Sequence, residues 1–228
     1  MEPLEAARTA VVVVDVQNDY CHPQGAVASS QDFGLMERIL APQVRLLETA
    51  VEAGLLVVFV RATILPGHVD ESPARLHGKH RTLPHYAIPT ADYVIAGTWG
   101  HDVVDELKEV VPNAVHVFKS RNGAFANTNL DLVLRSNGID ALLVTGMATD
   151  GCVAATVRGA EDHGYRCVVL RDCVASFKPE LHEQTLKVFA SRMDVVPSAD
   201  VLRLLDPGDH ATHPNPIEAE MSTDSSGS

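Results

Sequence analysis

The sequence is poor in cysteine, and this excludes two kinds of stabilising site. Its 228 residues include four cysteines, with no Cys-x-x-Cys pair among Cys21, Cys152, Cys167 and Cys173. Neither a disulfide framework nor a zinc site built from thiolates is expected, and the thiols are expected to be reduced.

Positive charge and long apolar runs are also scarce. Lys and Arg number 18 against 30 Asp and Glu, so the formal net charge is −12. Because an acidic surface does not attract nucleic acid or anionic membranes, we expect neither as a partner. No apolar run approaches the roughly 20 residues that cross a bilayer, and the start Met-Glu-Pro-Leu-Glu lacks the basic residues of a secretory signal. We therefore expect a cytoplasmic protein.

Apolar residues, by contrast, are abundant and regularly spaced. They make up 46% of the chain, which is enough for a large core. Continuous apolar runs predict buried strands at 9–16, 55–60, 114–118, 141–145, 167–170 and 195–196. Helices are predicted at 35–53, 102–108 and 130–137, between Cys152 and Gly164, and at 179–192. This alternation predicts an α/β fold, a doubly wound three-layer α/β/α sandwich around a parallel sheet.

Two segments fall outside this alternation. Residues 62–97 lose the periodicity and gather prolines, glycines and four histidines. A loop of this length is usually functional, so we expect a lid, a binding wall or a subunit contact. Residues 207–228 contain almost no apolar side chains, so we expect a disordered tail behind a single domain that spans residues 1–206.

Cys152 lies between the strand predicted at 141–145 and the helix that follows it. A thiol at the amino end of a helix lies near unpaired N–H groups, which lower its pKa and favour the nucleophilic thiolate. The alternative is that Cys152 is a small buried apolar residue. Asp150, two residues earlier, is expected to cap the helix rather than to react.

Asp15 and Lys119 follow two other predicted strands. The carboxyl ends of parallel strands meet at one edge of a sheet, where ligands bind, so we expect both residues near Cys152. A carboxylate can accept the thiol proton and return it to a leaving amine, while an ammonium stabilises the thiolate. The N–H groups of the turn 148–152 can donate to the oxyanion. A turn position for Asp15 and a surface charge for Lys119 are the structural alternatives.

Three ordered motifs carry a resemblance to a known family. They are Val-Asp-Val-Gln-Asn-Asp around Asp15, Lys-Ser-Arg-Asn-Gly-Ala-Phe from Lys119 with a following Asn-Thr-Asn-Leu-Asp, and Thr-Gly-Met-Ala-Thr-Asp-Gly-Cys ending at Cys152. Together they resemble the isochorismatase-like cysteine hydrolases over about residues 9–205. The resemblance implies that Asp15, Lys119 and Cys152 form a catalytic triad.

The resemblance also implies the geometry of the turn and the assembly of the chain. A cis peptide is implied between Met147 and Ala148, with an oxyanion hole formed by the N–H groups of Ala148 and Cys152. A homo-oligomer, dimer or tetramer, is expected as well.

Departures from the family motifs narrow the choice of reaction. Nicotinamidases of the family usually carry an Asp-x-His metal motif after the second strand, where this chain has Arg61-Ala-Thr-Ile-Leu. We therefore expect no metal, although His68, His77, His80 and His85 remain conceivable ligands. Isochorismatases of the family replace the nucleophilic cysteine, and its retention as Cys152 argues against vinyl-ether hydrolysis.

The sequence thus most resembles the amidohydrolase branch, which includes ureidoacrylate, biuret and N-carbamoylsarcosine amidohydrolases and a lactam-opening relative, streptothricin hydrolase. We expect Cys152 to attack a small amide, ureide or lactam through a thioester intermediate, with no cofactor. A nicotinamidase-type amidase and a catalytically silent small-molecule binder are the alternatives.

Candidate substrate contacts are Gln17, Asn18, Phe33, Trp99 and Arg121. Core packing is the alternative for the aromatics, and a salt bridge to Asp131 or another subunit for Arg121.

Overall fold

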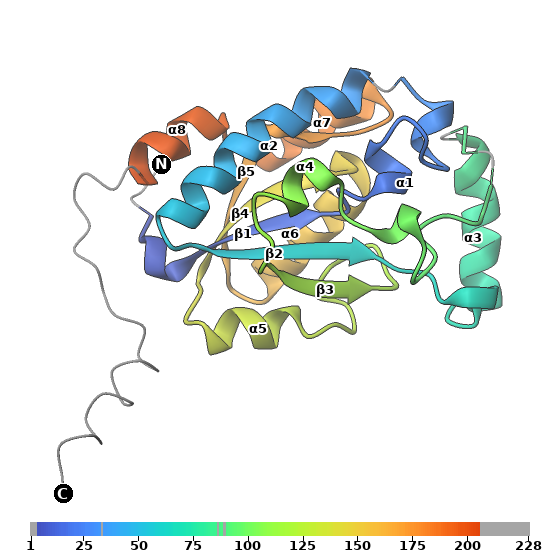
Figure 1. The fold of residues 1–228 in the computed structure, drawn as a ribbon, viewed down its shortest axis with the longest axis horizontal. Coiled ribbons are helices and arrows are strands. Elements are labelled where there is room, and N and C mark those ends of the chain that lie inside the picture. The colour runs from blue at the N-terminus through green and yellow to red at the C-terminus, as the bar shows by residue number, and fades with distance from the viewer. Residues whose placement is uncertain (1–3, 33, 86, 89, 206–228) are drawn as a thin grey trace, which may run out of the picture.

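Six strands form one parallel sheet at the centre of the molecule (Figure 1). The computed structural model describes residues 4–32, 34–85, 87–88 and 90–205. The strand order is β3-β2-β1-β4-β5-β6, and every neighbouring pair is parallel. The strands are β1 Thr9–Val14, β2 Leu56–Ala62, β3 Val115–Lys119, β4 Ala141–Met147, β5 Arg166–Ala175 and β6 Asp194–Val196. The predicted parallel sheet is therefore confirmed.

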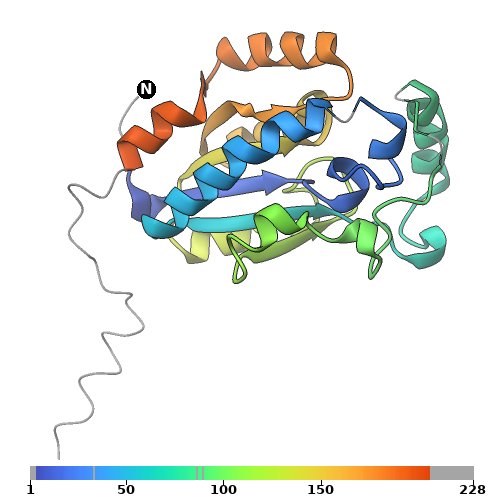
Figure 2. The ribbon, with the colours of Figure 1, turned by 45° about the horizontal axis from the view of Figure 1, so that its top comes forward.

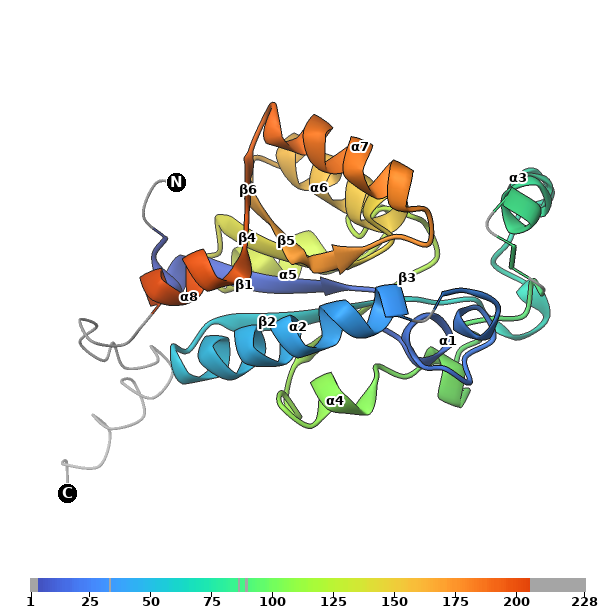
Figure 3. The same cartoon turned by 90° about the horizontal axis from the view of Figure 1, so that it is seen from above.

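Helices cover both faces of this sheet, as Figure 3 shows from above. One face carries α2 (Gly34–Glu52), α4 (Asp105–Lys108) and α8 (Ser198–Leu205), and the other carries α5 (Leu130–Ser136), α6 (Ala154–Asp162) and α7 (Pro179–Ala190). The remaining helices are α1 (Asn18–Cys21), α3 (Pro73–His85) and the short 3-10 turns Ala6–Arg8, Ala28–Ser30, Pro66–His68 and Trp99–His101. This is the predicted three-layer sandwich.

Strand β1 explains why the core has two halves. Side chains alternate between the faces of a strand, so Val11 and Val13 pack with α2 and α4 while Val12 and Val14 pack with α5 and α6. All six residues of β1 are buried. A continuous β-branched run is thus what a central strand covered on both faces requires.

The segment 62–97 departs from the predicted loop because it contains the helix α3. This helix stands beyond the carboxyl ends of β1 and β2, at the margin of the molecule (Figures 1 and 2). Its side chains are mostly polar, and Leu83 is its one buried apolar residue among those described. The periodicity that marks a core helix is therefore missing from its sequence.

Other boundaries differ by smaller amounts. Helix α8 was not expected from the sequence, and it is anchored by the fully buried Val201. Strand β5 continues to Ala175, five residues past the predicted end, while α4 is limited to one turn. The predicted disordered tail, residues 207–228, lies outside the described residues. Within the described residues no helix is long and apolar enough to cross a bilayer.

Gly146 lets the end of β4 approach β1 closely. Its φ is +105°, and a Cβ built there would lie 2.0 Å from the carbonyl oxygen of Val14. The pairing of β4 with β5 also shifts register between Val144 and Gly146. Such irregularities redirect the chain at the end of a strand. Here the redirected chain is the turn that carries Cys152.

Candidate active site

Asp15 is held rigidly at the carboxyl end of β1. Its φ of 54° lies in the left-handed region, which costs a non-glycine residue about 1–3 kcal/mol. The surrounding backbone fixes this conformation, because the Asp15 N–H donates to Val60 O at 2.8 Å and Oδ1 accepts from the Ala62 N–H at 2.7 Å. The buried carboxylate therefore has one oxygen engaged by β2 and the other directed elsewhere.

Lys119, the last residue of β3, reaches across the end of β2 to that second oxygen. Its Nζ lies 2.7 Å from Asp15 Oδ2, 3.3 Å from Cys152 Sγ and 3.2 Å from Arg121 O. The ammonium donates hydrogen bonds to the sulfur and to Arg121 O, and it forms an ion pair with the Asp15 carboxylate. Burial lowers the pKa of Lys119, but Asp15 and Cys152 outweigh burial and raise it above the ordinary value. The buried ammonium stays charged.

Cys152 lies in a single π-helical turn, Thr149–Val153, that joins β4 to α6. Burial and the adjacent Asp15 raise the pKa of its thiol to about 12, although the Lys119 ammonium opposes them. The predicted lowering of this pKa is therefore wrong for the resting site. Desolvation of a thiolate outweighs the dipole of one helical turn here. The resting group is therefore a thiol that lies between the Lys119 ammonium and the Asp15 carboxylate.

Replacing Asp15 with Asn is expected to make Cys152 more reactive toward iodoacetamide at neutral pH. The change removes the carboxylate that raises the thiol pKa and leaves the Lys119 ammonium beside the sulfur. A fall of one pKa unit increases the thiolate fraction about tenfold. The measurement is the pH dependence of alkylation, with the labelled residue identified by mass spectrometry. Labelling of the buried Cys167 or Cys173 would reveal unfolding instead, and slower labelling of Cys152 would contradict the prediction.

The turn before Cys152 has the implied geometry. The peptide bond between Met147 and Ala148 is cis, as the family resemblance implied. Ala148 O accepts hydrogen bonds from the N–H groups of Gly151 at 2.9 Å and Val153 at 3.1 Å. The turn is thus closed by its own backbone.

Side chains from the β5–α7 region support the turn from outside. His182 of α7 contacts Thr149 Oγ1 through Nδ1 at 2.8 Å, and Ser176 donates a hydrogen bond from Oγ to the Asp150 carboxylate. The N-cap residues of the π turn and of α6, Ala148 and Val153, have no side-chain cap hydrogen bond, and the capping role of Asp150 stays a prediction. The Ser176 hydrogen bond connects Asp150 and the catalytic turn to the chain that follows β5.

A cavity of about 330 Å³ opens above the thiol. Its floor is the catalytic turn with Asp15, and its walls are largely aromatic. The lining residues are Asp15, Tyr20, Ile88, Tyr93, Asn122, Met147, Ala148, Asp150, Gly151, Cys152 and Phe177. Ile88 and Tyr93 belong to the 62–97 segment, so this segment forms part of the cavity wall. A cavity of this size accommodates a small molecule.

Gln17, Asn18 and Trp99, expected as substrate contacts, do not line this cavity. Gln17 Nε2 donates to Ala62 O at 3.0 Å and to His101 O at 2.8 Å, and Asn18 Nδ2 donates to Trp99 O at 2.9 Å. The Trp99 ring is half exposed and packs against another ring outside the cavity. These residues connect α1 to the 99–102 turn, so their role in this structure is to join two segments rather than to line the cavity. Phe33 lies outside the described residues.

Arg121 also differs from its expected role. Its Nη1 donates to Ser120 O at 2.7 Å, and its own carbonyl accepts from Lys119. The alternative partner Asp131 is instead 3.0 Å from Arg135 and accepts from the Tyr165 hydroxyl. The pairing of Arg121 with Asp131 is therefore not formed, and the Arg121 side chain does not line the cavity.

Five lining residues were missed by the sequence reasoning: Tyr20, Ile88, Tyr93, Asn122 and Phe177. Asn122 lies within the Lys119 motif, and Tyr20 lies five residues after Asp15, so the motifs held a signal for both. Tyr93 and Phe177 come from connections whose course depends on tertiary packing. Only the structure brings these two rings to the cavity.

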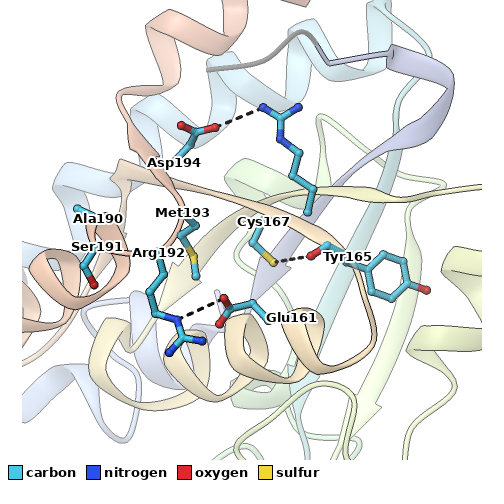
Figure 4. A pocket seen from close by; sticks show the side chains of 9 residues that line it. Glu161, Tyr165, Cys167, Ala190, Ser191, Arg192, Met193 and Asp194 are labelled. Carbon is cyan, nitrogen blue, oxygen red and sulfur yellow. Dashed lines mark hydrogen bonds and ion pairs between the residues drawn. The ribbon is translucent and has the colours of Figure 1, made fainter.

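A larger cavity of about 620 Å³ lies at the opposite edge of the sheet (Figure 4). It is lined by the starts of β5 and β6, where Arg166 pairs with Asp194 at 3.3 Å and Arg192 with Glu161 at 3.5 Å. Its thiol, Cys167, is buried, and burial raises its pKa to about 12. Ligands of open parallel sheets bind at the carboxyl ends of the strands, so this cavity is the weaker candidate.

Among the described residues, no group of three or more His, Cys, Asp or Glu side chains is arranged so that it could hold a metal ion. His68 contacts Glu71 Oε2 at 2.6 Å and Asp92 Oδ1 at 2.7 Å through its two ring nitrogens. The ring therefore joins two carboxylates within the 62–97 segment.

Comparisons with known proteins identify the family of this chain. The family model described as Isochorismatase domain matches residues 9–200. The chain is 31% identical over 187 residues to the ureidoacrylate amidohydrolase RutB of Rhizobium rhizogenes, covering 79% of this chain and 76% of that protein.

Solved structures share the fold. A cysteine hydrolase from Pseudomonas syringae pv. phaseolicola has a TM-score of 0.76 and 26% identity, covering 90% of this chain and 96% of its own. The nicotinamidase PncA of Bacillus subtilis has a TM-score of 0.68 and 28% identity, covering 83% and 99% respectively.

Proposed function

Because the chain belongs to the isochorismatase family, we propose that Cys152, Asp15 and Lys119 carry out the amide hydrolysis for which its relatives are named. The protein is a hydrolase acting on C–N bonds other than peptide bonds, and its substrate is a small-molecule amide. The observation that carries the assignment is a single ammonium, Lys119 Nζ, lying 2.7 Å from Asp15 and 3.3 Å from Cys152 beneath a small cavity.

The first half-reaction forms a thioester. Asp15 accepts the thiol proton while Cys152 Sγ attacks the substrate carbonyl carbon. The N–H groups of Ala148 and Cys152 donate to the tetrahedral oxyanion. When the C–N bond breaks, Asp15 returns the proton to the leaving nitrogen, so an amine or ammonia departs. Lys119 remains protonated throughout and balances whichever of the other two groups is negative.

The second half-reaction releases the acid. Water attacks the thioester carbonyl while Asp15 accepts a proton from it, and the sulfur then leaves and recovers a proton. The sum is the hydrolysis of one C–N bond, with the enzyme returned to its starting state. A thiol with a raised pKa suits this order of steps, because the proton moves to Asp15 as the sulfur attacks the carbonyl carbon.

We further propose a cytoplasmic location and an assembly of two or four identical chains, without nucleic acid or membrane partners. All four cysteines are unpaired, which supports a reducing compartment. Phe118, 52% exposed on the edge strand β3, is a surface that a second copy would cover.

The thioester is tested by trapping it. An ammonia-release screen over ureides, carbamoyl amino acids, nicotinamide and cyclic amides, with ring opening followed by mass, first identifies a substrate. Hydroxylamine is then expected to divert part of the product into the hydroxamate, in the same ratio from the amide and from an ester with the same acyl group.

Different partition ratios for the amide and the ester would contradict a shared thioester. A parallel arm with a metal chelator separates the metal-dependent nicotinamidase alternative, which predicts loss of turnover, from the proposed cysteine mechanism, which predicts none.

A further inference from the structure

The cavity above Cys152 is lined without a single positively charged side chain. Its eleven lining residues include no Lys and no Arg. The count covers the whole chain, since all 18 Lys and Arg residues fall within the described residues. A substrate carboxylate is normally held by an arginine or lysine. The neighbouring cations that could do this are Lys119, Arg121 and Lys79.

The two cations beside the catalytic residues are already engaged. Lys119 donates hydrogen bonds to Cys152 Sγ and Arg121 O and forms an ion pair with Asp15. Arg121 donates one of its N–H groups to Ser120 O, and its side chain does not line the cavity. Directing Lys119 at a substrate carboxylate would separate it from Asp15 at 2.7 Å in a buried position, which is strongly unfavourable.

A third cation lies behind the aromatic wall and is also committed. The Lys79 ammonium stands 4.6 Å from the centroid of the Tyr93 ring, 3.2 Å from Glu71 Oε2 and 3.0 Å from Ala91 O. Its side chain is nearly buried, and so is that of Glu71. Arg75 lies 3.4 Å from the same carboxylate. This cluster fixes Tyr93 in the wall, and its positive charges are balanced by Glu71.

The charges that do line the cavity are negative. Asp15 and Asp150 are the charged residues among those that line it. The remaining surface is apolar or aromatic, with Tyr20 and Tyr93 meeting edge to face at 5.7 Å and Phe177 nearby. Asn122 provides a neutral donor and acceptor. Such a surface favours a planar, uncharged group and repels a carboxylate.

We propose that this cavity selects small uncharged amides or ureides with a planar or apolar acyl group and excludes substrates that carry a carboxylate. The inference rests on the proposed function, and it separates this chain from the ureidoacrylate amidohydrolases that it resembles in sequence. Ureidoacrylate, as its name states, carries a carboxylate. The chain keeps the hydrolytic groups and lacks a cation to hold that acid.

Matched substrates test the proposal. Benzamide is compared with 4-carboxybenzamide, and methyl 3-ureidopropionate with 3-ureidopropionate, by kcat/KM. The neutral member of each pair is expected to exceed the acid by at least about 100-fold, since an unpaired charge in such a site costs several kcal/mol. Methyl 4-carbamoylbenzoate controls for size, because it is bulkier than the acid but uncharged, and it is expected to outperform the acid.

The outcomes separate this inference from the proposed function. Equal kcat/KM values within each pair, or preference for the acids, overturn the inference and leave the cysteine mechanism standing. If no amide or ureide is hydrolysed, the proposed function fails. The inference is then judged by protection of Cys152 from iodoacetamide, where benzamide is expected to protect at concentrations at least about 100-fold lower than 4-carboxybenzamide. Equal protection overturns it.

A charge introduced into the wall provides the matched variant. Ile88 lines the cavity and is partly exposed, so an arginine fits there with its head near solvent. Ile88→Arg is expected to shift the ratio of acid to neutral kcat/KM toward the acid at least about tenfold relative to Ile88→Met. An unchanged ratio would mean that charge does not set the selectivity, which overturns the inference.

Discussion

Cys152→Ala is expected to reduce kcat by at least about 10⁴-fold while leaving the protein folded, because loss of a covalent nucleophile removes the reaction pathway itself. The substitution deletes one sulfur atom, and Lys119 keeps Asp15 and Arg121 O as acceptors. No buried charge is left without a partner. The unfolding midpoint is therefore expected to change little, and it is measured by circular dichroism alongside ammonia release.

Two further variants sharpen this test. Cys152→Ser retains a hydroxyl in place of the thiol and is expected to be nearly as inactive, since a serine here has no histidine base. Cys167→Ala makes the same chemical change at a buried thiol far from the site and is expected to retain turnover. Amide hydrolysis that persists in Cys152→Ala would exclude the thioester mechanism.

Lys119→Met is expected to cost about 3–5 kcal/mol of unfolding free energy as well as turnover, because it leaves the buried Asp15 carboxylate without its cation. Asp15→Asn is expected to be less destabilising, since the Cys152 thiolate can take over as the counter-ion of Lys119. The double variant removes both charges, so its destabilisation is expected to fall short of the sum of the two. Denaturant unfolding of the four proteins measures this coupling.

A surface pair provides the control for that cycle. Arg203 and Asp200 are 2.9 Å apart but largely exposed, and their coupling is expected to be small by comparison. Purely additive effects at Asp15 and Lys119 would mean that the two charges do not stabilise each other. Turnover is expected to be lost in both single variants and in the double variant. Proton transfer needs the Asp15 carboxylate, and the negative charge on Asp15 or Cys152 needs the Lys119 ammonium.

The sequence predicts the sheet well because a central parallel strand is buried on both faces. The run Val11–Val14 has no polar residue to make it ambiguous. Asp15, Lys119 and Cys152 were predicted to meet for a related reason, since each follows a strand and parallel strands end at one edge. Helix α3 could not be predicted in this way, because ion pairs of Glu71 rather than an apolar stripe attach the segment.

The sequence predicted where the site residues lie better than it predicted their burial and their hydrogen-bond partners. The Cys152 thiol was expected to have a lowered pKa, but burial depends on how closely the cavity walls approach, and local sequence does not report that. Gln17 and Asn18 follow Asp15 closely in the sequence. Their side chains nevertheless donate hydrogen bonds to the 99–102 turn, about eighty residues away along the chain. Hydrogen-bond partners at such separations follow from tertiary folding.

The cavity of this protein draws its reacting groups and its walls from different parts of the chain. Asp15 and Lys119 are carried by strands whose positions the sheet fixes, while Ile88, Tyr93 and Phe177 are carried by connections between elements. Connections tolerate substitution and insertion more readily than buried strands do. Descendants of such a chain can therefore acquire new substrates by changes in the connections alone, with the hydrolytic step inherited intact. The same separation makes the wall residues the natural positions to randomise in a laboratory search for new amidase specificities.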